Sequence, residues 1–190
     1  MSLQHLILGV LKYGPLSGYD LNKAFRASVE HFWNTEQSQI YRALYKMHEA
    51  GWVEIEQIIQ ENLPSKKVYH LTDVGREELH HWLTVPQGLP SAHEGWLGQL
   101  FFGSELNKDQ IKRLLEYRID ELRRLIQHFE NDIPASAEAY AEAYKASSDL
   151  PYWLLTLDYG LQRLRFDLEW AQETLASLDH LPNGSNEKKE

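Results

Sequence analysis

The chain has 190 residues, of which 43% are hydrophobic and 25% are charged, and its formal net charge is −9. This composition is ordinary for a globular protein, and the length allows one large domain or two small ones. The absence of cysteine excludes disulfides and cysteine-ligated zinc. No apolar run reaches the ~18 residues of a membrane span, and no signal-peptide pattern is present, which predicts a cytoplasmic protein with no membrane association.

The first 51 residues contain three helical patterns. Apolar residues three and four positions apart predict a first helix, which ends at a Gly-Pro pair. Ser17 with Asp20 three residues later marks the start of a second helix. A third helix is expected from about residue 36 to 50, between a Thr35 cap and Gly51. Its predicted buried side carries Ile40, Leu44 and Met47, and its opposite side carries Ser38, Arg42, Tyr45 and Glu49.

After the third helix the pattern changes to strands. Residues 52–59 and 66–71 predict two strands joined by a turn at 61–65. The residues expected to face inward are Val53, Ile55 and one of Ile58 and Ile59. Thr72 then caps a fourth helix, whose apolar residues are Val74, Leu79, Trp82 and Leu83. Three helices, a hairpin and a further helix form the winged helix-turn-helix arrangement.

The C-terminal half is predicted to be almost wholly helical. Asn107 and Gln110 form a predicted capping box for a helix that runs to about residue 131, and residues 135–147 predict a separate helix. The last helix starts near Pro151. It repeats apolar residues at alternating steps of three and four, a leucine seam that is interrupted only by Ala171 and is typical of coiled coils: Leu154, Leu157, Leu161, Leu164, Leu168, Ala171, Leu175 and Leu178.

The predicted fold class is mainly α with a small β-hairpin. We expect a winged-helix DNA-binding domain over 1–85, a linker over 86–91, a helical dimerisation domain over 92–180 and a disordered tail over 181–190. The leucine seam fits either a homodimer or a bundle within one chain. Aromatic residues of the C-terminal half could line a pocket for a small aromatic effector or form helix core; the candidates for the pocket are Trp96, Phe101 and Trp153.

The third helix has the side chains of a DNA recognition helix. A helix fits the major groove and presents its exposed N-terminal residues to base edges. The residues suited to bases are Gln37, Ser38, Gln39 and Arg42, and those suited to phosphates are Tyr41, Lys46, Lys66 and Lys67. The alternative is a solvated helix. Residues 1–86 carry 8 Lys and Arg against 10 Asp and Glu, so DNA binding needs a local basic patch.

No pattern predicts catalysis. The nucleophile-elbow, phosphate-loop, dinucleotide and HExxH zinc motifs are all missing from the sequence. The adjacent His80 and His81 point ~100° apart on a helix and do not suit a shared metal. We therefore expect a protein that is not an enzyme and needs no cofactor or metal. The alternative to a double-stranded DNA partner is a winged-helix module that binds protein.

Three segments resemble the PadR family of transcription regulators. They are SGYDL at 17–21, NTEQSQIYRALYKMHEAGWVE at 34–54 and SKKVYHLTDVGREEL at 65–79. The resemblance extends more loosely over the helical half, which is similar to the larger branch that includes virulence-gene activators. It implies a homodimer on a pseudo-palindromic operator, usually as a repressor, and it adds Tyr19 to the DNA-facing residues. The ENLPSKK wing departs from the Gly- and Arg-rich wing of many members.

Overall fold

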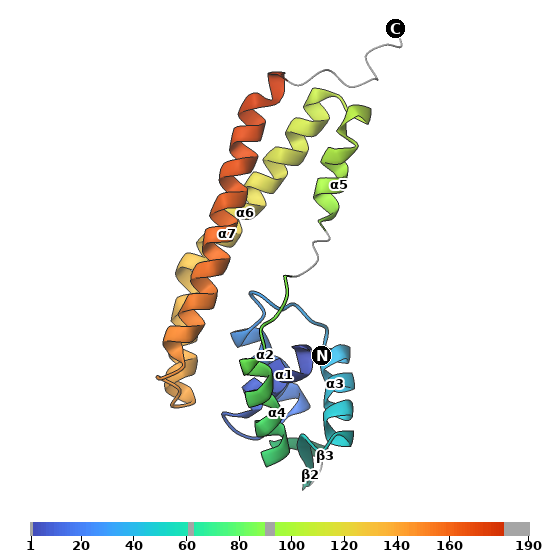
Figure 1. The fold of residues 1–190 in the computed structure, drawn as a ribbon, viewed down its shortest axis with the longest axis vertical. Helices are drawn as coiled ribbons and strands as arrows, with labels where there is room; N and C mark the ends of the chain where they lie inside the picture. Colours follow the sequence, from blue (N-terminus) through green and yellow to red (C-terminus); the bar gives the residue numbers. More distant parts are fainter. Residues whose placement is uncertain (1, 61–62, 90–93, 181–190) are drawn as a thin grey trace. The chain divides into compact units, whose positions relative to one another are not determined.

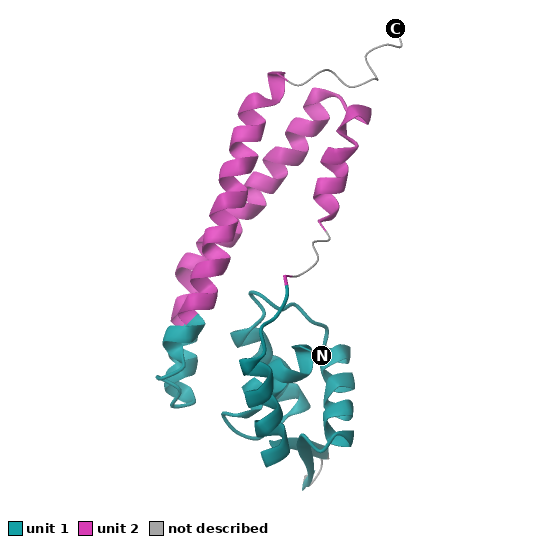
Figure 2. Ribbon diagram, in the orientation of Figure 1, with its two compact units in different colours: residues 1–88, 136–153 teal, residues 89–135, 154–190 magenta. Residues whose placement is uncertain are grey.

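The computed structural model describes residues 2–60, 63–89 and 94–180. The chain forms two compact units (Figures 1 and 2): residues 1–88 with 136–153, and residues 89–135 with 154–190. The order of helices and strands confirms the predicted mainly α fold class with a winged-helix arrangement. The predicted disordered tail at 181–190 lies outside the described residues, as do parts of the predicted turn and linker.

The first unit holds four short helices around one hydrophobic core. They are α1 (Ser2–Leu11), α2 (Gly18–Ser28), α3 (Gln37–Glu49) and α4 (Asp73–Thr84). The large side chains that are fully buried come from α1, α2, α3 and the following strand: Ile7, Leu8, Leu11, Leu21, Phe25, Ile40, Leu44, Met47 and Val53. The helical periodicity of the sequence thus predicted the faces that form this core.

Local signals fix where these helices begin and end. The Ser17 hydroxyl accepts a hydrogen bond from the Asp20 backbone N–H at 3.1 Å and caps α2. Thr72 caps α4 in the same way, through the Gly75 backbone N–H at 3.0 Å. Both caps confirm the sequence predictions. Gly51 follows α3 with a φ of +72°, a left-handed conformation in which glycine avoids the strain of a side chain.

The sheet has three antiparallel strands in the order β1–β3–β2. They are β1 (Leu16–Ser17), β2 (Val53–Gln60) and β3 (Leu63–Leu71). The hairpin of β2 and β3 was predicted. The third strand, β1, was not; it adds the pairs Leu16–Tyr69 and Ser17–Val68 on the far side of β3.

Four apolar residues of β2 and α4 are exposed: Ile58, Ile59, Val74 and Leu83. Ile58 is 41% exposed and Ile59 is 88% exposed, because β2 and β3 continue past the last pair that reaches the core, Ile55 with Tyr69. Val74 and Leu83 on α4 are also exposed, since Leu79 and Trp82 are the large apolar side chains that α4 turns toward the core. The expectation that Ile58 or Ile59 faces inward was therefore wrong.

The second unit is built from helices alone. It contains α5 (Gly95–Phe101), most of α6 (Lys108–Ala143), most of α7 (Leu150–Ser177) and two short 3-10 turns, Gly103–Glu105 and Leu178–His180. The predicted capping box is present, since Asn107 and Gln110 exchange two hydrogen bonds of 2.9 Å. The predicted break between residues 131 and 135 is wrong. Pro134 lies inside α6. The proline removes one backbone hydrogen bond, but the helix-forming residues that follow it sustain the helix.

Few side chains of the second unit are buried. They come from one face of α6, one face of α7 and the turn that follows: Leu115, Ile119, Leu122, Phe129, Leu157, Ala171 and Leu178. Gly160 lets the two helices approach closely, because a Cβ atom there would lie 2.7 Å from Cε1 of Phe129. Among the described residues, no helix has the length and hydropathy needed to cross a bilayer.

Helix α5 is attached to the second unit by one tryptophan. The guanidinium of Arg118 lies 3.7 Å from the centre of the Trp96 ring, and Trp170 meets the same ring edge-on at 5.4 Å. The Trp96 indole N–H donates to Glu94 at 2.9 Å. No residue of α5 is fully buried, and Phe101 is exposed.

Candidate nucleic-acid interface

Helix α3 begins with a hydrogen-bonded cap that uses one of its predicted base-reading residues. Its N-cap is Glu36 rather than the predicted Thr35. The Thr35 hydroxyl donates to Oε1 of Gln39 at 2.6 Å, and the Glu36 backbone N–H donates to the same atom at 3.3 Å. The amide oxygen of Gln39 is therefore occupied, and only its NH2 group remains for a ligand.

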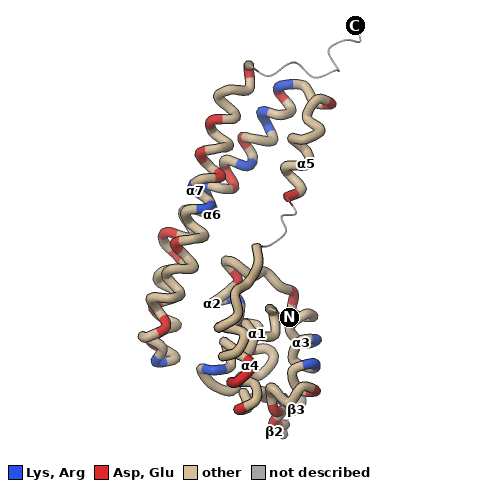
Figure 3. Tube along the Cα trace, in the orientation of Figure 1, with Lys and Arg blue, Asp and Glu red and all other residues tan. Residues whose placement is uncertain are grey.

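The two faces of α3 differ as the sequence predicted. Ile40, Ala43, Leu44 and Met47 are buried in the core. The opposite face is exposed and consists of Gln37, Ser38, Tyr41, Arg42, Tyr45 and Lys46. Basic residues lie along the middle of this helix, with acidic residues at its ends (Figure 3). Across the described ranges, Arg42 and Lys46 form no ion pair.

Tyr41 joins α3 to the start of α2. A Cβ atom on Gly18 would lie 2.5 Å from Cε1 of Tyr41, so the ring packs directly on the glycine backbone. Tyr41 nevertheless remains 42% exposed. Tyr41 therefore packs against Gly18 with one part of its ring and leaves the rest exposed to solvent. The neighbouring Tyr45 bonds to Glu49, and this carboxylate raises the pKa of the Tyr45 phenol.

A hollow lies on the wing side of α3. Its volume is about 650 Å³, and it is lined by Ser17, Gly18, Tyr19, Asp20, Tyr41, Ser65, Lys66, Lys67 and Tyr69. The structure thus brings four of the predicted DNA-facing residues together here: Tyr19, Tyr41, Lys66 and Lys67. We name it the wing-side hollow.

One lysine of the wing-side hollow is already paired. Lys66 Nζ lies 2.9 Å from Oδ2 of Asp20, and the Ser17 hydroxyl donates to the same oxygen at 2.6 Å. The hydrogen bond from Ser17 and, to a smaller extent, the bond from Lys66 lower the pKa of Asp20. Lys66 therefore meets an anionic ligand only in competition with Asp20, whereas Lys67 is exposed and has no ion partner in the described part of the chain.

A second hollow lies on the α1 side of α3. Its volume is about 840 Å³. It is lined by residues of α1, of the loop before α3 and of α3 itself: Leu3, Gln4, Trp33, Asn34, Thr35, Gln39, Tyr41, Arg42, Ala43, Tyr45 and Lys46. We name it the α1-side hollow. Tyr41 lines both hollows, so α3 forms a ridge between them.

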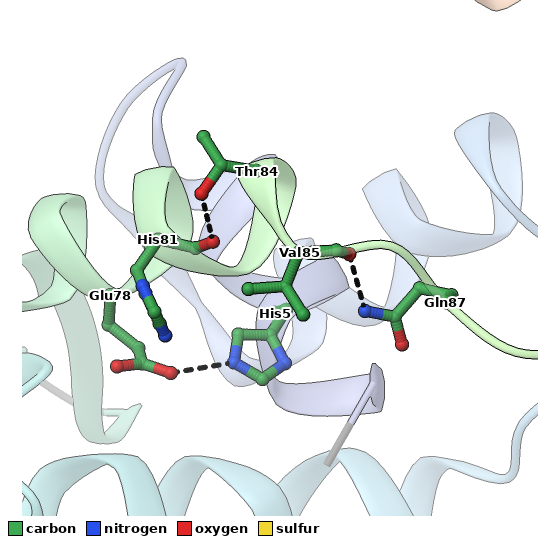
Figure 4. A network of polar contacts seen from close by, with 6 residues as sticks. All are labelled: His5, Glu78, His81, Thr84, Val85 and Gln87. Carbon is green, nitrogen blue, oxygen red and sulfur yellow. Dashed lines mark hydrogen bonds and ion pairs between the residues drawn. The ribbon is translucent and has the colours of Figure 1, made fainter.

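The α1 wall of this second hollow is anchored by a buried histidine (Figure 4). His5, the residue after Gln4, is 3% exposed, and its Nε2 donates to Oε1 of Glu78 on α4 at 3.0 Å. Its ring stacks on Trp82 with centroids 5.0 Å apart. These contacts fix the position of α1 against α4.

The predicted effector residues do not form one cluster within either unit. Trp153 belongs to the first unit, where it meets Tyr13 at 5.9 Å and Tyr140 at 5.6 Å. Trp96 and Phe101 belong to the second unit. Burial raises the pKa of Tyr140, and its hydroxyl has no hydrogen-bond partner in the described residues.

The predicted dimerisation leucines are largely covered within the single chain. Leu157 and Leu178 are buried, Leu154 is exposed, and Leu161, Leu164, Leu168 and Leu175 are half-buried. The opposite face of α7 carries an exposed apolar stripe, formed by Leu155, Tyr159 and Phe166. Sequence reasoning missed this stripe because its members are separated by charged and polar residues and show no repeat as regular as the leucines.

Sequence reasoning also missed Gln4 and Asn34. They come from α1 and from the loop before α3, and only the folded chain brings them beside Lys46. In the described residues, no group of three or more His, Asp or Glu side chains has a metal-binding arrangement.

In a comparison with known proteins, each half of the sequence matches a described protein family. Residues 7–81 match the Transcriptional regulator PadR-like family, and residues 94–179 match Virulence activator alpha C-term. The Negative transcriptional regulator PadR of Bacillus subtilis is 34% identical over 182 residues, which cover 93% of this chain and 97% of that protein.

Solved structures agree over nearly the whole length. Bacillus subtilis PadR in complex with operator DNA has a TM-score of 0.77 and 29% identity, covering 94% of this chain and 100% of that one. The same protein in complex with p-coumaric acid gives 0.73 and 27%, covering 94% and 99%. The Vibrio cholerae virulence activator AphA gives 0.71 and 30%, covering 95% and 99%.

Proposed function

The chain belongs to the PadR-like family of transcriptional regulators, and from this premise we propose that it represses transcription by binding operator DNA as a homodimer. It is a regulator and not an enzyme. The observation that carries the proposal is the exposed ridge of α3, on which Arg42 and Lys46 are held without ion partners in the described residues. A protein with this target acts in the cytoplasm, where the chromosome is.

Ser38 and Arg42 are the residues we assign to base reading. Both lie on the exposed side of α3, four residues apart, and are directed away from the core. Arginine pairs with guanine through two parallel hydrogen bonds, and a serine hydroxyl pairs with several bases. Gln37 adds a third base-reading side chain, whereas Gln39 offers only its NH2 group.

Binding of labelled DNA tests this assignment. The probe is a duplex that wild-type protein selects from a random-sequence pool. Arg42→Ala should weaken binding by about 1–3 kcal/mol and relax the preference for one base pair. The matched control is Arg26→Ala, which removes an exposed arginine from α2, outside both hollows. A wild-type chain with no salt-dependent duplex binding would favour the protein-binding alternative.

The homodimer is supported by the exposed stripe on α7. Leu155, Tyr159 and Phe166 are 65–70% exposed in the single chain. Monomeric proteins rarely leave apolar surface of this kind in contact with water. We infer that a second copy covers this face, whereas the leucine seam on the opposite face packs within one chain.

Sedimentation of a charged variant tests the dimer. Tyr159→Glu should raise the dimer dissociation constant at least thirtyfold, since buried interface aromatics contribute ~2 kcal/mol or more. Gln172→Glu is the control, because it adds the same charge to an exposed position of α7 away from the stripe. Equal dissociation constants for the two variants would remove the stripe from the interface.

We also propose that a small aromatic carboxylate releases the protein from DNA. The relative that binds operator DNA was also solved with p-coumaric acid. The first unit has an aromatic cluster of Tyr13, Tyr140, Tyr144 and Trp153 beside Lys12. Titration with p-coumaric acid should quench tryptophan fluorescence and lower DNA affinity, and Trp153→Phe should lose most of the signal. An unchanged fluorescence and affinity would exclude this ligand.

A further inference from the structure

The two hollows beside α3 have the arrangement that a helix in the major groove requires. The groove is ~12 Å wide, and a sugar–phosphate backbone borders it on each side. A helix that fills the groove therefore has one backbone along each flank. In this unit the flanks of α3 are the wing-side hollow and the α1-side hollow, with Tyr41 between them.

The two hollows differ in the cations they offer. Lys66 of the wing-side hollow is bonded to Asp20, whereas Lys67 has no ion partner among the residues that the structure describes. The α1-side hollow has two exposed cations, Arg42 and Lys46, neither of which has an ion partner in the described ranges.

The polar groups of the α1-side hollow also suit a phosphate. The exposed side-chain amide of Asn34 and the amide of Gln4 can each donate hydrogen bonds to phosphate oxygens. Leu3 and Trp33 supply apolar surface at which the deoxyribose can pack. None of the described residues that line this hollow is acidic.

We infer that the α1-side hollow, and not the wing, is the main phosphate grip of this protein. It holds one DNA backbone through Lys46, with Asn34 and Gln4 as neutral donors, while Arg42 keeps the base-reading role assigned above. This inference rests on the proposed function. Among the four residues that the sequence predicted to contact phosphates, it assigns the main role to Lys46 and not to Lys66 and Lys67. The wing then contributes position more than charge.

Salt-dependent DNA binding tests the grip. The probe is a mixed-sequence duplex of about 30 base pairs, three helical turns, because backbone contacts do not depend on base identity. The logarithm of the binding constant falls with the logarithm of salt concentration, with a slope of about −0.9 per phosphate neutralised. Lys46→Ala should reduce the magnitude of this slope by about 1.8, because each of the two subunits of the proposed homodimer loses one phosphate contact. Asn34→Ala should weaken binding several-fold and leave the slope unchanged, because it removes a neutral donor.

Two control proteins make the comparison specific. Lys23→Ala removes an exposed lysine of α2 that lines neither hollow, and it should leave the slope unchanged. The double variant Asp20→Asn with Lys66→Ala removes the bonded pair as a neutral unit, and it should also leave the slope unchanged.

Two results overturn the inference. The first is a salt-dependence slope for Lys46→Ala that equals the slope for Lys23→Ala. The second is a decrease in slope for the Asp20 and Lys66 double variant that is as large as the decrease for Lys46→Ala. In both cases the wild type still binds DNA, so the proposed function survives. A wild type that binds no duplex is a different result, and it overturns the proposed function itself.

Discussion

The first unit and the second unit differ in how completely they bury their apolar side chains. In the first unit, buried apolar residues of α1, α2, α3 and β2 form one core, in which Leu44 and Phe25 are 0% and 1% exposed. In the second unit, α6 and α7 bury a single face, while Phe101, Tyr159 and Phe166 remain exposed. One region is complete as a single chain. The other leaves apolar side chains exposed, which the proposed homodimer would cover.

The difference also appears in how each region holds its helices. In the first unit, α1 is fixed by His5 between Trp82 and Glu78, deep in the protein. In the second, α5 is attached by Trp96 and Arg118, on an element without a fully buried residue. We therefore expect the first region to be stable at any protein concentration and the second to depend on association.

The same substitution placed in each region should give the largest contrast. Leu44→Ala should lower the free energy of unfolding by about 2–5 kcal/mol, because it removes a fully buried side chain and leaves a cavity. Leu125→Ala, at a position that is 43% exposed on α6, should cost less than half as much. Urea unfolding followed by circular dichroism measures both. Equal losses would show that α6 is as well packed as the N-terminal core.

A pair of glycines tests how closely the first unit is packed. Gly18→Ala should destabilise the protein by about 1–3 kcal/mol and weaken DNA binding, because the new methyl group displaces the Tyr41 ring. Gly9→Ala meets no atom within 4 Å on α1 and should be neutral or stabilising by up to about 1 kcal/mol. Thermal unfolding and a duplex-binding assay on both variants check this. A harmless Gly18→Ala would mean that Tyr41 can move freely.

Helix caps should contribute equally in the two regions, although their cores differ. Thr72→Ala removes the cap of α4, and Asn107→Ala removes the cap of α6. The lost cap should cost ~1 kcal/mol in each variant. Thr72→Ala also loses the hydrogen bond that its hydroxyl donates to the Gly51 carbonyl at 2.7 Å. Chemical denaturation of the two variants at one protein concentration makes the comparison. A much larger loss for Asn107→Ala would indicate that α6 needs its cap to hold the second unit together.

The smallest effect is expected in acid. The pKa of Asp20 is lowered in the folded protein, so its contribution to stability is present above the unfolded value, 3.8, and is lost as the pH falls through the folded value. The loss should be at most about 1 kcal/mol, because both Asp20 and Lys66 are 41% exposed and water screens the pair. Unfolding of wild type and Asp20→Asn at pH 5 and pH 2.5 measures it. A wild type that loses no more stability than the variant would contradict the assignment.

The local features of the fold were predictable from sequence because their signals are local. Ser17, Thr72 and Asn107 each cap a helix through a hydrogen bond to a residue three positions later, so each cap depends only on neighbouring residues. Gly51 ends α3 for a reason confined to its own backbone. The division of α3 into a buried and an exposed face follows from helical periodicity. These local features determine where α3 begins and ends and which of its residues are exposed, and α3 carries most of the candidate interface.

The features that were missed depend on distant parts of the chain. Strand β1 has two residues, and its partner Tyr69 lies more than fifty positions later. Ile58 and Ile59 follow the strand pattern but extend past the core. The bond between Lys66 and Asp20 and the placement of Gln4 beside α3 arise only on folding.

The cap at the start of α3 determines which positions can change in evolution. Gln39 bonds to Thr35 and Glu36, and Tyr41 packs on Gly18, so substitution of either disturbs the helix itself. In the part of the chain that the structure describes, Gln37 makes no such contact, and the contact that Arg42 makes is a bond of its Nε to the Ser38 carbonyl at 3.4 Å. A descendant gene could therefore acquire a new operator by drift at these freely variable positions while inheriting an unaltered scaffold.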